Sequence, residues 1–155
     1  MTFYDLLWYF TIYSFLGWCS EVIFATVTTG KFVNRGFLNG PVCPIYGFGM
    51  SLVLLVLLPF SDNIPLLFIG GALLTSAIEL VGGWALKKFF HTTWWDYSDQ
   101  PFNLGGYICL KFSILWGLCV VVVIRIVHTA IASFVHWIPF MLGAILVGIF
   151  IALFI

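Results

Sequence analysis

The chain has 155 residues, of which 63% are hydrophobic and only 8% are charged, and its formal net charge at pH 7 is +0. Soluble domains are about half apolar and a quarter charged, so this composition excludes a soluble globular protein and indicates an integral membrane protein. A helix of roughly 20 apolar residues crosses the hydrocarbon core of a bilayer. The sequence therefore has room for about five spans and for no soluble domain, and we expect no nucleic-acid partner.

Uninterrupted apolar runs predict five transmembrane helices within a single transmembrane domain, residues 1–155, of the all-α class. The predicted spans are Leu6–Thr28, Pro41–Phe60, Pro65–Leu86, Gly106–Ile124 and Ala130–Ile155. Only "SDN" separates the second span from the third, and only "RIVHT" separates the fourth from the fifth, which predicts two tight antiparallel hairpins. The other two connections are longer and polar, and they emerge on the same side of the membrane.

Positive charge gathers at that one side, because Lys31, Arg35, Lys87 and Lys88 flank it while Arg125 lies on the other. The positive-inside rule then places the four basic residues in the cytoplasm. We expect a multi-pass protein of the plasma membrane with its amino terminus outside and its carboxyl terminus inside. The first span is too long for the apolar core of a cleavable signal peptide, so it is expected to remain.

The two polar connections resemble each other, which predicts an internal repeat. "RGFLNGPVCPIYG" and "QPFNLGGYICLKFS" share an aromatic residue, an asparagine and a glycine three residues before a cysteine. Upstream of each connection lies one carboxylate with a Gly-Trp neighbour, Glu21 in the first span and Glu79 in the third. The predicted helix-loop-helix repeats are residues 6–60 and 65–124, followed by an extra helix, residues 130–155. Two copies of two spans run in the same direction, so their axis should lie along the membrane normal; the alternative is chance similarity among apolar residues.

Ionisable residues inside the predicted spans are the main candidates for function, since each costs on the order of 3 kcal/mol on insertion scales and usually faces a bundle interior or a wet cavity. Glu21, Glu79 and Lys111 lie at matching predicted depths. We therefore expect them to converge in a cytoplasm-facing polar cavity, where a carboxylate and the ammonium can pair. The alternative is structural, with small residues packing the helices and one Glu–Lys bridge joining them.

The stretch "WDYSDQPFNLGGYICL" predicts an irregular loop at the start of the fourth span. Asp96 and Asn103 supply polar atoms there, and Asn39 before Gly40 and Pro41 repeats the arrangement. Irregular backbone at membrane depth is tolerated only inside protein or against water, so the loop is interpreted as re-entrant or cap-forming. Helix amino termini at this level could bind an anion or a polar headgroup; the alternative is simple capping, with the aromatic residues forming an interface belt.

Cysteine and histidine patterns predict no metal site. Cys19, Cys43, Cys109 and Cys119 lack CxxC spacing, and the three histidines are scattered. Buried, reduced cysteines are expected, with a thiol pair from the two repeats as the alternative. No phosphate-binding GxxxxGK[ST] motif occurs, so we expect no nucleotide hydrolysis and no cofactor.

Four segments, "FLGWCSEVIF", "NRGFLNGPVCPIYGFG", "WDYSDQPFNLGGYICL" and "FSILWG", resemble the bacterial ABC-transporter type IV family of permease-like proteins, which is also similar to eukaryotic transmembrane protein 229. The resemblance spans about residues 3 to 125. It implies membership of that family, and the family has no secure substrate. An ATPase partner is implied by the family name, but the loops are short for docking one. The family's signature segments contain Glu21, Asn39, Gly40, Pro41, Cys43, Tyr46, Glu79, Trp95, Asp96, Asn103, Gly106 and Lys111.

These observations leave three functional hypotheses open. The first is a small permease-like protein, expected to be a homo-oligomer in the lipid bilayer, that transports an unknown small molecule or lipid. The second is an intramembrane enzyme acting on a lipid or lipid-linked substrate, against which the lack of a catalytic signature weighs. The third is a noncatalytic membrane partner subunit. The candidate substrate-binding or cavity residues are Glu21, Asn39, Cys43, Tyr46, Glu79, Trp95, Asp96, Asn103, Cys109 and Lys111.

Overall fold

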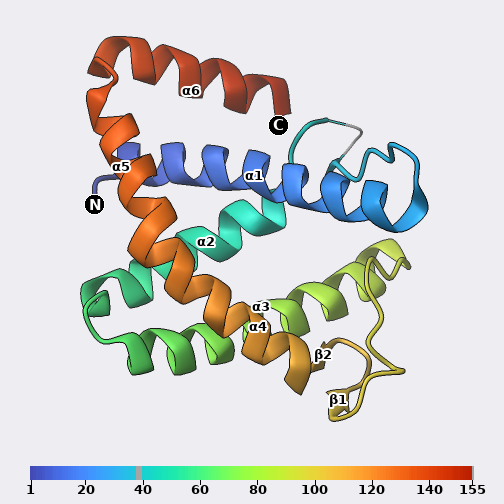
Figure 1. Cartoon of the computed structure of the whole chain (residues 1–155). Helices are drawn as coiled ribbons and strands as arrows, with labels where there is room; N and C mark the ends of the chain where they lie inside the picture. Colours follow the sequence, from blue (N-terminus) through green and yellow to red (C-terminus); the bar gives the residue numbers. More distant parts are fainter. Residues whose placement is uncertain (38–39, 155) are drawn as a thin grey trace. The chain divides into compact units, whose positions relative to one another are not determined.

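A computed structural model of the protein describes residues 1–37 and 40–154, which form five helical segments and one short hairpin (Figure 1). The first two segments are α1 (Phe3–Thr29) and α2 (Pro44–Leu57), the latter continued by the 3-10 turn η2 (Leu58–Phe60). Next come α3 (Ile64–Phe90) and the strands β1 (Asn103–Leu104) and β2 (Ile108–Cys109). The fourth segment joins α4 (Leu110–Val122), the π-helical turn η3 (Val123–Val127) and α5 (His128–Trp137), and the fifth is α6 (Phe140–Phe154).

The lengths and composition of these helices confirm an all-α membrane protein. Three helices are long and apolar enough to cross a membrane, namely Phe3–Thr29, Ile64–Phe90 and Leu110–Trp137. Two further apolar helices, Pro44–Phe60 and Phe140–Leu153, are shorter. Large apolar side chains such as Phe24, Leu73 and Ile126 are exposed on the long helices, as expected of surfaces that face lipid.

Local sequence signals explain where the long helices begin. Thr2 and Asp5 form a reciprocal capping box at the start of α1, with Thr2 N donating to Asp5 Oδ2 at 2.7 Å. Asn63 caps α3 by accepting from Leu66 N at 3.0 Å, and proline occupies the first turn. α2 begins at Pro44 rather than at the predicted Pro41.

The predicted break between the fourth and fifth spans is wrong in position. The polar residues of "RIVHT" predict a loop, but the helix runs through them from Leu110 to Trp137. Arg125 Nη1 lies 2.9 Å from Asp62 Oδ1, and His128 is buried, so neither polar residue needs to leave the helix. The break falls at Ile138 and Pro139, because proline lacks the amide hydrogen and disfavours a helical residue before it.

The chain packs as two compact units, residues 1–52 with 130–155 and residues 53–129. In the first unit α6 lies beside α1, and buried aromatic residues of α1, among them Trp8, Tyr9 and Tyr13, contribute much of the core. In the second unit α4 packs along α3. The predicted repeat boundaries, 6–60 and 65–124, and the extra helix, 130–155, remain predictions.

Candidate functional site

Glu21 is the centre of a polar cluster in the first unit. Tyr46, from α2, donates its hydroxyl to Glu21 Oε1 at 2.6 Å, and Arg35 Nε lies 3.5 Å from Glu21 Oε2. The tyrosine ring reaches α1 because Gly17 leaves room for it; a Cβ at that position would overlap the ring. Each oxygen of this carboxylate therefore has a donor from a different part of the chain.

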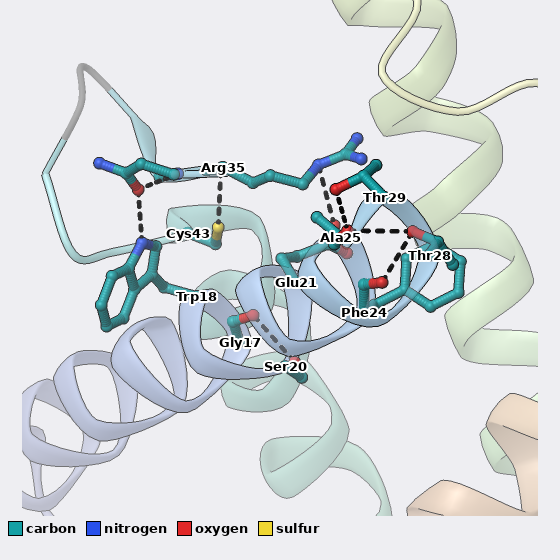
Figure 2. A network of polar contacts seen from close by, with 12 residues as sticks. Gly17, Trp18, Ser20, Glu21, Phe24, Ala25, Thr28, Thr29, Arg35 and Cys43 are labelled. Carbon is teal, nitrogen blue, oxygen red and sulfur yellow. Dashed lines mark hydrogen bonds and ion pairs between the residues drawn. The ribbon is translucent and has the colours of Figure 1, made fainter. Parts of the chain in front are cut away.

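The loop after α1 is fixed in a conformation that extends Arg35 along α1 toward Glu21 (Figure 2). Trp18 Nε1 donates to Asn34 Oδ1 at 2.7 Å, and the same oxygen accepts from Gly36 N at 3.0 Å. The Cys43 thiol donates to the Arg35 carbonyl oxygen at 3.5 Å. These contacts hold the loop backbone on both sides of Arg35 in the sequence. The conformation of the loop therefore positions the Arg35 guanidinium.

Cys43 belongs to this cluster through contacts of its thiol and its backbone. It is buried, and its backbone amide donates to the Ser14 carbonyl at 2.9 Å. Burial, with the nearby Glu21 carboxylate adding to it, raises the pKa of the Cys43 thiol to about 11. A thiol in that range stays protonated near neutral pH and is a poor nucleophile.

Glu79 is the centre of a second polar cluster, in the second unit. Trp116 Nε1, from α4, donates to Glu79 Oε1 at 2.8 Å, and the Tyr97 hydroxyl lies 3.3 Å from the same oxygen. The other oxygen, Oε2, is buried and has no hydrogen-bond partner among the described residues. Both donors are neutral, and within the described residues no Lys, Arg or His nitrogen lies within 4.0 Å of this carboxylate.

Further polar atoms lie on the same pair of helices. Ser76, on α3, donates its hydroxyl to Ser113 Oγ of α4 at 2.6 Å, and Ser113 in turn donates to the Cys109 carbonyl at 3.0 Å. Ser76 precedes Glu79 by about one helical turn. Two hydroxyl groups, those of Ser76 and Ser113, therefore meet at the α3–α4 contact.

The loop before α4 brings Tyr97 to Glu79. Asn103 clamps the loop, with Nδ2 donating to the Gln100 carbonyl at 2.8 Å and Oδ1 accepting from Gly106 N at 3.2 Å. Gly106 has a positive φ of 77°, a conformation that suits glycine. Tyr97 N donates to the Gly106 carbonyl at 2.9 Å, and the Tyr97 ring stacks on Phe112 with centroids 4.6 Å apart.

Asp96 and Trp95 stabilise turns within the loop, and the capping that the sequence left open as one alternative is not made at the start of α4. Asp96 Oδ1 accepts from Ser98 N at 2.9 Å, and Trp95 Nε1 donates to the Tyr107 carbonyl at 3.0 Å. The N-cap of α4 is Cys109, which makes no side-chain capping bond. The Ser98 hydroxyl and amide, by donating to the carboxylate, hold the pKa of Asp96 below its usual range.

The structure groups the predicted candidates within each unit. Glu21, Tyr46 and Cys43 lie together in the first. In the second, Trp95, Asp96, Asn103 and Cys109 build the loop whose Tyr97 contacts Glu79. Asn39 lies outside the described residues.

Lys111 is expected to pair with one of the two acids; Glu79 lies in the same unit as Lys111 and forms no ion pair with it. The Lys111 side chain is exposed, and its Nζ lies over the Phe112 ring at 5.7 Å from the centroid. The acid is held by aromatic donors instead.

Sequence reasoning missed three partners of the acids. In the sequence, Arg35 counts only as a charge that indicates topology, Tyr97 belongs only to the aromatic residues of a possible interface belt, and Trp116 lies only within the family segment "FSILWG". A usable signal exists for Trp116, because "YG" and "WG" each follow a polar loop, as Tyr46 with Gly47 and as Trp116 with Gly117.

Comparison with known proteins assigns the family. No curated protein and no solved structure matches the chain. A family model described as "Putative ABC-transporter type IV" matches residues 8–155. Since that match covers nearly the whole chain, and since the chain is helical with three candidate membrane spans, the protein is a membrane protein that belongs to the ABC-transporter type IV family.

Proposed function

We propose that the protein is a small permease-like transporter in which Glu79 binds the transported solute or a coupled proton. The observation that carries this proposal is the state of the Glu79 carboxyl group. It lies within a membrane-spanning helix, both of its donors are neutral and reach the same oxygen, and its second oxygen is buried without a partner.

The energetic argument starts from the cost of such a group. An acid in a span costs on the order of 3 kcal/mol, so a purely structural role would favour its replacement by an apolar side chain. Trp116 and Tyr97 repay part of that cost but supply no positive charge. A carboxylate in this state interacts more favourably with a cation or a proton than one already paired with Arg or Lys.

We extend the proposal to the side of the membrane. Four basic residues, Lys31, Arg35, Lys87 and Lys88, favour a cytoplasmic location for the two polar loops. The site would then open toward the cytoplasm, in a multi-pass protein of the plasma membrane that assembles as a homo-oligomer. The convergence of Glu21, Glu79 and Lys111 in one cavity stays a prediction, and so does an ATPase partner.

Purified protein in liposomes provides the test. Liposomes would be incubated with a small-molecule cell extract, and the trapped solutes profiled by mass spectrometry for wild type, Glu79→Gln and Asp62→Asn. Asp62→Asn is the matched control, because it also removes one carboxylate charge but at a fully exposed position. We expect at least one solute to accumulate about tenfold more with wild type and the control than with Glu79→Gln, because one hydrogen bond to a charged group contributes about 1.5 kcal/mol or more and 1.4 kcal/mol corresponds to about tenfold.

The other hypotheses predict different results. An enzyme acting on lipid-linked substrates would change the lipid profile of the liposomes without trapping a solute. A noncatalytic partner would leave both profiles equal to those of empty liposomes. Either result, or equal accumulation with Glu79→Gln and wild type, contradicts the transport proposal.

A further inference from the structure

The two acid sites are built from the same local parts. In each unit an aromatic side chain of the following helix donates to Oε1 of the acid, Tyr46 to Glu21 at 2.6 Å and Trp116 to Glu79 at 2.8 Å. In each unit a glycine follows that aromatic residue directly.

The two glycines also occupy equivalent environments. A Cβ at Gly47 would lie 2.6 Å from the carbonyl oxygen of Phe10, and a Cβ at Gly117 would lie 2.8 Å from the carbonyl oxygen of Phe68. Phe10 precedes Glu21 by eleven positions, and Phe68 precedes Glu79 by eleven. The helix pairs thus share one register, in which the acid, the phenylalanine carbonyl and the aromatic-glycine dipeptide correspond.

The correspondence differs from the one that the loops suggest. Aligning the glycine-to-cysteine motifs would pair Tyr46 with Phe112, whereas the contacts pair Tyr46 with Trp116, one helical turn further along. The contacts carry more weight, since they include the hydrogen bond to the acid and the close approach of the glycine backbone.

The sites differ in what contacts the acid from the loop. In the first, Arg35 presents a guanidinium nitrogen 3.5 Å from Glu21 Oε2. In the second, the loop supplies only the Tyr97 hydroxyl, which contacts Oε1 at 3.3 Å, and Oε2 is left buried without a partner among the described residues. The first site therefore holds a cation that belongs to the chain, and in the described part of the chain the second site has no counterpart to it.

We propose that the Glu79 site binds a guanidinium-type organic cation, and that Arg35 occupies the corresponding place in the Glu21 site as a built-in ligand. Guanidinium presents planar donors that match a carboxylate, and it is more weakly hydrated than an ammonium ion, which suits a site of low polarity. Both bonds that hold Glu79 reach Oε1, the Tyr97 bond at 3.3 Å being the longer, so Oε2 is the oxygen left for the cation. This proposal rests on the proposed transport function and names its substrate class.

Methylguanidinium at millimolar concentration is the probe, with tetramethylammonium at equal ionic strength as a cation that donates no hydrogen bonds. The measurement is the thermal unfolding temperature, Tm, of the purified protein in detergent. For one site, a ligand at ten times its Kd raises Tm by about 3–6 °C. We expect such a rise in wild type with methylguanidinium only, and no rise in Glu79→Gln.

Arg35→Ala gives a second, independent readout. Removing the built-in cation opens the Glu21 site, so Arg35→Ala should respond to methylguanidinium more than wild type does. The double variant Arg35→Ala/Glu79→Gln should retain the response that the Glu21 site contributes. Lys31→Ala, which removes a nearby loop cation without a contact to Glu21, is the matched control and should behave as wild type.

Besides the absence of a Tm rise in wild type, three outcomes would overturn the inference. They are equal Tm rises in wild type and Glu79→Gln, equal rises with methylguanidinium and tetramethylammonium, and no response of the double variant. The transport proposal is tested separately by solute trapping. If Glu79→Gln abolishes trapping while methylguanidinium leaves wild-type Tm unchanged, the substrate class is wrong and transport stands; equal trapping removes the transport proposal itself.

Discussion

At the scale of single residues, the Trp116–Glu79 contact decides how the acid is held within its span. The indole nitrogen donates to Oε1 at 2.8 Å, which is a short bond for a nitrogen donor. Trp116→Phe keeps the ring but removes the donor, so we expect a loss of about 1–3 kcal/mol in unfolding free energy. Chemical unfolding in mixed detergent micelles would measure it.

The control for this prediction is a double-variant cycle. In a Glu79→Leu background the indole nitrogen loses the Glu79 acceptor, so Trp116→Phe should cost less than it does in wild type. Trp94→Phe, at an exposed tryptophan, should change stability by less than about 0.5 kcal/mol. Equal costs of Trp116→Phe in both backgrounds would contradict the assigned hydrogen bond.

Asp96 makes the loop before α4 sensitive to acid. The hydrogen bonds from Ser98 lower the folded-state pKa of Asp96 from its ordinary value of 3.8. A lowered pKa means that the charged carboxylate stabilises the folded loop fully above pH 3.8, and that this contribution is lost as pH falls through the lowered value. We expect amide hydrogen exchange in residues 95–106 to speed up, after correction for its intrinsic pH dependence, when the protein is acidified through that range.

Two variants separate this effect from general acid unfolding. Asp96→Asn removes the titrating group, so the corrected exchange rates should lose their step in that range. Ser98→Ala removes the side-chain donor but keeps the backbone donor, so the pKa of Asp96 should rise toward its ordinary value. A step that persists in Asp96→Asn would assign the transition to another group.

At the scale of secondary-structure elements, the apolar pattern predicts the long helices well. Two predicted spans agree closely with the structure. Leu6–Thr28 lies within α1 (Phe3–Thr29), and Pro65–Leu86 lies within α3 (Ile64–Phe90). Lipid solvates these helices, so hydrophobicity and capping residues decide their ends. The prediction fails at Arg125 and His128, because ion pairing and burial depend on the packed structure, which a window of sequence does not contain.

The candidate site is less predictable than the helices. The two acids are identifiable from the cost of charge in a span, and Tyr46 from the family resemblance. Tyr97 reaches Glu79 because the loop before α4 is held by hydrogen bonds of the Asn103 side chain and by the left-handed conformation of Gly106. The sequence does not show this loop conformation. Lys111 shows the converse. Its position in the sequence predicts a depth at which it could pair with a carboxylate, but its side chain is exposed on α4 and makes no ion pair with Glu79.

Helix packing in each unit depends on one glycine next to the aromatic donor. Gly47→Ala and Gly117→Ala would place a methyl group within 3 Å of a backbone carbonyl oxygen of the neighbouring helix, at 2.6 and 2.8 Å respectively. Backbone cannot yield as a side chain does, so we expect each variant to lose about 1–3 kcal/mol. Thermal unfolding in detergent would measure the loss.

Gly148→Ala is the matched control, because this glycine of α6 has no heavy atom within 4 Å of the added Cβ. It should be neutral or stabilise the helix by up to about 1 kcal/mol, the intrinsic preference for alanine. Destabilisation by Gly148→Ala equal to that by the other two would show that the effect is not close packing.

At the scale of the whole molecule, the basic residues predict how the chain inserts. In a variant without its four natural cysteines, Asp62→Cys should react with a membrane-impermeant maleimide added outside intact cells, because Asp62 is fully exposed. His91→Cys, directly after α3 and its basic end, should not react until the membrane is opened. The reverse labelling pattern would invert the predicted topology.

The length of α3 has a consequence for the lipid that surrounds the protein. Its 27 residues extend about 40 Å, whereas the hydrocarbon core is about 30 Å thick. Glu79 lies a fixed distance of about 12 Å along the helix from Lys87. A change in bilayer thickness therefore alters mainly the thickness of hydrocarbon between Glu79 and the membrane surface at the other end of α3. Hydrophobic mismatch should therefore regulate the protein. If the Lys87 end of α3 faces the cytoplasm, longer acyl chains add apolar thickness on the other side of Glu79, so solute passage in liposomes should slow. A rate that does not depend on acyl-chain length would show that the limiting step lies on the Lys87 side of Glu79.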